Sequence, residues 1–93
     1  MKAEWRKFAV FHEYAEFVVL GVDAPDRCTH ALSSEITAVQ REMLETERVP
    51  YFRMRLAFFR NLVPYCSAQP ELYSPTDLAQ FRANVTTLEG LVK

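Results

Sequence analysis

The stretch PYFRMRLAFFRNLV, Pro50–Val63, decides the fold of this chain. At about 3.6 residues per turn, its apolar side chains fall on nearly every side of a helix, and only Arg53 and Arg60 form a polar stripe. A helix that is apolar nearly all round is usually buried on several sides. The stretch is shorter than the roughly 20 apolar residues that cross a bilayer. It therefore predicts a central core helix that other helices surround.

Arg55 lies in the middle of the aromatic side of this helix. An unpaired charge in apolar surroundings is unfavourable, so its guanidinium must reach a carboxylate, extend to water or meet a partner. We favour a paired arginine, or one that extends to water along its apolar stem, over an arginine that binds an anion.

Three further helices are expected, and the first runs from Lys2 to about Leu20. Its end is ambiguous, because the β-branched and aromatic residues of Phe17–Val22, FVVLGV, would suit a strand equally well. We favour a helix there, since no other stretch of the chain offers a convincing pairing strand.

The second helix is expected to begin at the cap residue Asp23, with Pro25 in its first turn, and to end at about Arg48. Val49-Pro50 is expected to break or kink the run before the central helix, because proline lacks the amide donor and restrains the residue before it. Glu35 belongs to a mainly acidic face that we expect to be solvated. The apolar stripe of this helix consists of Cys28, Leu32, Ile36, Val39 and Met43.

A proline-rich loop, Pro64–Tyr73, is expected before the last helix. Ser74, Pro75 and Asp77 give that helix a serine cap, a proline at the first helical position and an acid at the third. Spacings of three and four predict a narrow apolar seam, formed by Leu78, Phe81, Val85, Leu88 and Val92. The predicted fold class is all-α. Residues 1–93 form a single domain, a small antiparallel bundle of about four helices that a partner or a second copy could complete.

The composition favours a protein that binds other proteins. The chain has 93 residues, of which 49% are hydrophobic and 13% aromatic, and a domain this small has limited room to bury them. Excess apolar surface usually marks an interface. The net charge of −1 gives no general attraction to nucleic acid. No apolar stretch of signal-peptide length precedes Glu13, which indicates a cytoplasmic protein without a membrane segment.

Few residues suggest metal binding or catalysis. His12 and Glu16 stand one helical turn apart, and a third metal ligand would have to come from His30 or Cys28 on another helix. His12 also lies among apolar residues, so we favour a packed histidine with one hydrogen bond and expect no metal and no cofactor. Cys28 and Cys66 match no zinc spacing, and a disulfide between them is not indicated. Without a catalytic motif or a glycine-rich phosphate loop, we expect no enzyme.

The favoured function is a small helical protein–protein interaction module, such as an adaptor, chaperone, inhibitor or small subunit of a complex. It would act through exposed apolar and aromatic helix surfaces on a protein partner or a second copy, with no small-molecule substrate. Aromatic residues and arginine are enriched at binding hot spots. The residues expected to bind the partner are Trp5, Phe8, Phe52, Arg53, Arg55, Phe58, Phe59 and Arg60.

Two alternatives stay open. The basic and aromatic patch Arg48–Arg60 could bind single-stranded nucleic acid by base stacking and phosphate contacts, although the aromatic residues are needed for the core. A small helical enzyme centred on Arg55 and His12 is the further alternative.

Overall fold

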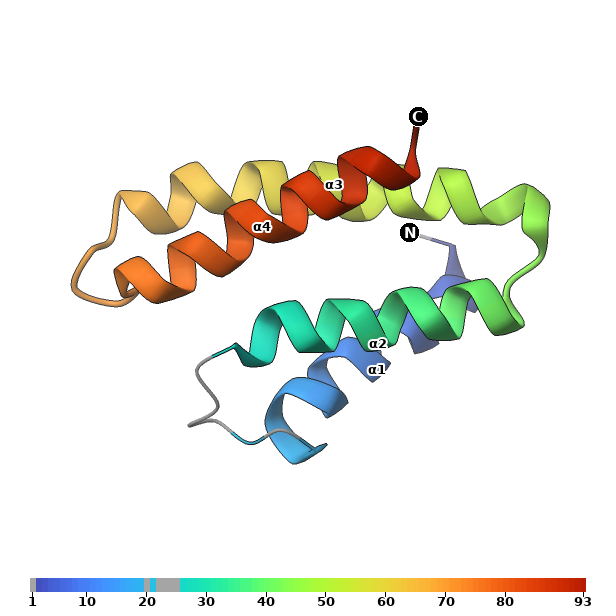
Figure 1. Ribbon diagram of the computed structural model, residues 1–93, viewed down its shortest axis with the longest axis horizontal. Helices are drawn as coiled ribbons and strands as arrows, with labels where there is room; N and C mark the ends of the chain where they lie inside the picture. Colours follow the sequence, from blue (N-terminus) through green and yellow to red (C-terminus); the bar gives the residue numbers. More distant parts are fainter. Residues whose placement is uncertain (1, 20, 22–25) are drawn as a thin grey trace. The chain divides into compact units, whose positions relative to one another are not determined.

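The computed structural model describes residues 2–19, 21 and 26–93, without the side chain of Val19. Over these residues all regular secondary structure is helical and there is no strand, which confirms the all-α fold class (Figure 1). None of the described helices is long and apolar enough to span a membrane. The four α-helices are α1 (Arg6–Tyr14), α2 (Arg27–Glu42), α3 (Glu45–Ser67) and α4 (Pro75–Leu91).

The chain divides into two compact units, Met1–Arg48 and Val49–Lys93. The first unit contains a helical arm, made of the 3-10 turn η1 (Ala3–Trp5), α1 and the π-helical turn η2 (Ala15–Val19). This arm packs against α2. The core of the first unit is formed by apolar side chains from the arm, α2 and the residue after it: Trp5, Phe8, Ala15, Cys28, Ala31, Leu32, Ala38, Val39 and Met43.

The described part of the ambiguous Phe17–Val22 stretch is helical, because Phe17, Val18 and Val19 belong to η2. Leu20 and Val22 lie outside the described residues, and so do Asp23 and Pro25, which were expected to begin the second helix. The first described turn of α2 begins at Arg27, with Asp26 before it as the cap residue.

The predicted end of the second helix near Arg48 is wrong, and the helix does not break at Val49-Pro50. Helix α2 ends at Glu42 and α3 begins at Glu45, so Pro50 lies inside α3. The chain turns at Met43, which is extended (φ −84°, ψ 144°) and whose carbonyl oxygen accepts a hydrogen bond of 3.1 Å from Nε of Arg48. Burial of the Met43 side chain and this bond stabilise the corner without glycine or proline.

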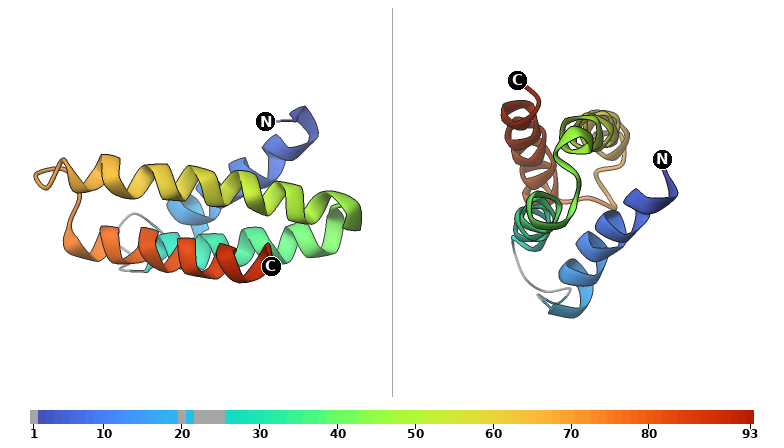
Figure 2. Two further views of the ribbon diagram at one scale, coloured as in Figure 1. Left: turned by 90° about the horizontal axis from the view of Figure 1, so that it is seen from above. Right: turned by 90° about the vertical axis from the view of Figure 1, so that its right-hand side faces the viewer.

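In the second unit, α3 and α4 form an antiparallel helical hairpin (Figures 1 and 2). An ion pair of 3.0 Å between Arg60 and Glu89 links the two helices. Pro64 lies inside α3, which continues to Ser67, so the connecting loop begins later than predicted. Pro64 lies in the last turn of this long helix, so the helix ends soon after the hydrogen bond that the proline removes.

Helix α4 begins as predicted, but the residues that it buries differ from the predicted seam. The Asp77 amide donates to Oγ of Ser74 (3.1 Å) and the Ser74 amide donates to Oδ2 of Asp77 (3.0 Å), which completes a capping box. Of the five predicted seam residues only Leu88 is fully buried, whereas Gln80 and Asn84 are buried beside it at a spacing of four. Amide side chains can occupy core positions when they are hydrogen-bonded, and apolar spacing does not reveal them.

Candidate functional site

One face of the helical arm exposes five large apolar side chains, with exposed fractions between 39% and 64%. We name this surface the α1 stripe, formed by Val10, Phe11, Tyr14, Phe17 and Val18. Residues at these spacings fall on one side of a helix. The opposite side of the arm buries Trp5, Phe8 and His12. The arm therefore has two apolar faces, and α2 covers one of them.

A cation contacts the C-terminal end of the α1 stripe. The guanidinium carbon of Arg27, the first residue of α2, lies 5.0 Å from the centroid of the Phe17 ring. This distance is within the range of a cation–π contact. The ring of Phe17 therefore has a defined position although about half of it is exposed.

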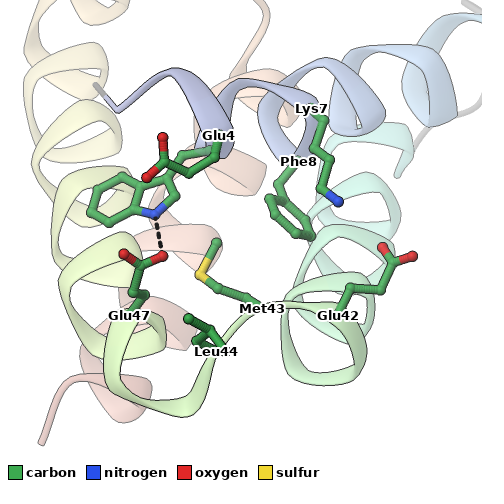
Figure 3. Close-up of a pocket in the computed structure, with 8 residues that line it drawn as sticks. Glu4, Lys7, Phe8, Glu42, Met43, Leu44 and Glu47 are labelled. Atoms are coloured by element: carbon green, nitrogen blue, oxygen red, sulfur yellow. Dashed lines mark hydrogen bonds between the residues drawn. The ribbon is translucent and has the colours of Figure 1, made fainter.

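A pocket of about 200 Å³ lies between the start of the arm and the corner after α2 (Figure 3). Trp5, Phe8 and Met43 provide its apolar surface, and its charged rim includes Lys7 and three glutamates, Glu4, Glu42 and Glu47. Glu47 accepts hydrogen bonds from Nζ of Lys2 (3.0 Å) and from Nε1 of Trp5 (3.2 Å). These two bonds hold the pKa of the Glu47 carboxyl below its ordinary value of 4.5.

The buried face of the arm contains a histidine between two carboxylates. Nδ1 of His12 lies 2.8 Å from Oε1 of Glu35, and Nε2 lies 3.3 Å from Oε2 of Glu16. His12 is 4% exposed and Glu35 is 0% exposed, so the prediction that Glu35 is solvated is wrong. His12 is packed as predicted, with two partners instead of one. The other oxygen of Glu16 lies 3.3 Å from Nε of Arg27.

Cys28 joins this group from α2. Ligand atoms of His12, Glu16 and Cys28 all lie within 4.8 Å of one another. His30, the other candidate for a third ligand, is exposed and lies 2.7 Å from Asp26. The structure therefore selects Cys28 over His30 as the residue that completes a set of one nitrogen, one oxygen and one sulfur donor.

Five of the eight residues expected to bind a partner are buried: Trp5, Phe8, Phe52, Arg55 and Phe59. Trp5 and Phe8 still line the pocket of the first unit. The guanidinium carbon of Arg55 lies 5.1 Å and 5.3 Å from the ring centroids of Phe58 and Phe59. The exposed members are Arg53, Phe58 and Arg60.

Two cations of the Arg48–Arg60 patch have partners within their own units, since Arg48 binds the Met43 carbonyl oxygen and Arg60 binds Glu89. None of the residues expected to bind a partner belongs to the α1 stripe, although its signal is present in the sequence as apolar residues on both sides of one helix. His12 and Arg55 lie in different units, so an enzyme that uses both stays a prediction. No protein-family model, curated protein or solved structure matches the chain.

Proposed function

We propose that this chain is a small protein–protein interaction module whose α1 stripe binds an amphipathic helix of a partner protein. The observation that carries the proposal is the exposure of five large apolar side chains on one side of the arm. Contiguous apolar patches on the surface of a small protein often mark interaction sites. Three of the five residues are aromatic, a type that is enriched at the core of protein interfaces.

The size of the α1 stripe favours a helix over a whole folded partner. Its three aromatic side chains, each about half exposed, offer on the order of 300 Å² of surface, to which the two valines add less. A stable interface between two folded proteins buries about 800 Å² on each side. The stripe alone is therefore too small for a dimer of this chain, and it suits one short helix.

The length of the α1 stripe fits the same occupant. From Val10 to Val18 the helical rise is about 12 Å, the span over which a bound helix presents apolar anchors at positions i, i+4 and i+7. The exposed Lys7 precedes the stripe and Arg27 lies beside Phe17 at its other end. Arg27 already pairs with Glu16, so a partner helix with an acidic residue outside its apolar anchors would complement Lys7.

Site-specific photocrosslinking tests the proposal. A photoreactive phenylalanine analogue replaces Tyr14 in the full chain, and the peptide crosslinked in the native host is identified by mass spectrometry. The same analogue at Leu72, which is 66% exposed and lies in the loop before α4, serves as the control. We expect the Tyr14 position alone to capture a segment with an amphipathic helical pattern.

Binding of the synthesised segment completes the experiment. Tyr14→Ser should weaken its affinity for the chain by about tenfold or more, equivalent to about 1.4 kcal/mol, whereas Leu72→Ser should leave it unchanged. Equal binding by the Tyr14→Ser variant would reject the α1 stripe as the binding surface. A stable dimer that persists at the dilute concentrations of the binding assay in light scattering, and that Tyr14→Ser dissociates, would identify a second copy as the occupant and overturn the proposed partner.

A further inference from the structure

We propose that the first unit binds one Zn²⁺ ion through Nε2 of His12, a carboxylate oxygen of Glu16 and Sγ of Cys28. The three ligand atoms lie within 4.8 Å of one another, and the His12 and Glu16 atoms are 3.3 Å apart. Zinc holds thiolate sulfur at about 2.3 Å and imidazole nitrogen at about 2.0–2.1 Å, so ligand atoms around it lie roughly 3.3–3.8 Å apart. Small side-chain rotations are enough to close the site.

Glu35 prepares His12 for this role. Its Oε1 lies 2.8 Å from Nδ1 of His12, where it accepts the ring proton. Nε2, on the other side of the ring, faces Oε2 of Glu16 at 3.3 Å, so both atoms are placed to bind the same ion. A carboxylate on the far nitrogen is the usual second partner of a histidine that binds zinc.

The backbone at Glu16 has an uncommon helical conformation. Glu16 belongs to the π-helical turn η2, and single π-helical turns occur frequently at functional sites. The three ligands come from α1, η2 and α2, so a bound ion would connect the arm to α2.

The charge and type of the donors suit zinc. A thiolate and a carboxylate together oppose the charge of Zn²⁺, with Oε2 of Glu16 facing His12 while Oε1 faces Arg27. Sulfur ligands favour zinc over magnesium or calcium. On binding, the thiol proton of Cys28 leaves to solvent. His12 and Cys28 are buried, and the Glu16 side chain is 16% exposed, so an ion would enter past Glu16. Three protein ligands leave a fourth position for water.

Cobalt substitution tests the site in the full chain after removal of any tag and bound metal. We expect one Co²⁺ per chain, with the visible absorption of tetrahedral cobalt and a sulfur-to-cobalt charge-transfer band, and displacement of the cobalt by Zn²⁺. Cys28→Ser should abolish the charge-transfer band, and Cys66→Ser, which alters the other buried cysteine, should retain it. His12→Gln should prevent binding, and His30→Gln should not.

A second variant tests the role of Glu35. Glu35→Gln should lower the Zn²⁺ affinity by about 10–100-fold, the usual effect of removing a group that orients a ligand. Circular dichroism confirms that each variant is folded. Absence of Co²⁺ binding by the unaltered chain would overturn the proposal, and so would a charge-transfer band that persists in Cys28→Ser. Stripe variants such as Tyr14→Ser should bind Co²⁺ normally, which separates this result from the fate of the proposed function.

Discussion

The sequence contains a signal for the burial of Glu35 but none for its hydrogen-bond partner. It stands between Leu32 and Val39 at helical spacings, so a charged side chain occupies a position on the apolar stripe of α2. That position is a signal for burial. Its partner, His12, lies 23 residues earlier on another helix, and no local pattern connects the two. The burial of Glu35 could be predicted from the sequence, whereas the His12–Glu35 pair could not.

Glu47 leads to a prediction about pH. A carboxyl whose pKa is lower in the folded than in the unfolded protein stabilises the fold above its unfolded pKa, and this contribution is lost as the pH falls through the folded pKa. The hydrogen bonds from Lys2 and Trp5 lower the pKa of Glu47 in this way. Between about pH 6 and pH 3, we therefore expect the unaltered chain to lose more stability than Glu47→Gln.

Urea unfolding at a series of pH values measures this difference, and the fluorescence of Trp5, the single tryptophan, reports locally on Glu47. Glu4→Gln is the matched control, because Glu4 lines the same pocket and is exposed. This variant should keep the pH dependence of the unaltered chain. An unchanged pH dependence in Glu47→Gln would show that Glu47 is not the group responsible.

The contribution of the capped first turn of α4 to the stability of the protein can be predicted from four residues. Ser74→Ala removes the side-chain acceptor of the capping box and should lower the free energy of unfolding by about 1 kcal/mol. Ser74→Asp supplies another acceptor and should stay close to the unaltered chain. Thr76→Ala, in the same exposed first turn, should change the stability by less than about 0.5 kcal/mol. Equal urea midpoints for all three variants would mean that the cap does not stabilise the helix.

The difference between this cap and the corner before α3 has a physical cause. The cap depends on residues adjacent in the chain, so the sequence predicts it. The corner at Met43 depends on burial of the Met43 side chain and on a hydrogen bond from Arg48. Neither feature requires a glycine or proline that would mark the corner in the sequence. The two prolines suggested breaks at the wrong places, because Pro50 and Pro64 lie near the two ends of α3 and the helix continues past both.

For the whole chain, composition predicted a surplus of apolar surface without locating it. Both α1 and the central stretch of α3 are apolar on more than one side. In the structure, Tyr51, Phe52 and Phe59 of α3 are buried, and the arm keeps an exposed apolar face. Which face stays exposed is decided by packing between helices, and the periodicity of one helix does not contain that information.

An exposed apolar stripe on a chain with a net charge of −1 predicts weak self-association at high concentration, because little charge repulsion opposes it. The double variant Tyr14→Glu and Phe17→Glu changes the net charge from −1 to −3 and interrupts the stripe. We expect it to be more soluble and to bind less of an apolar fluorescent dye. Its stability should change by no more than about 1 kcal/mol, since both positions are exposed.

A charge-matched control separates the effect of added charge from the effect of removing apolar surface. Ser34→Glu with Gln40→Glu adds the same two charges at exposed positions of α2 and removes no apolar surface. If this control raises solubility as much as the stripe variant does, charge alone explains the effect and the stripe has no part in self-association. Dye binding decides independently, because only removal of Tyr14 and Phe17 should reduce it. Undiminished dye binding in the stripe variant would place the accessible apolar surface elsewhere in the molecule.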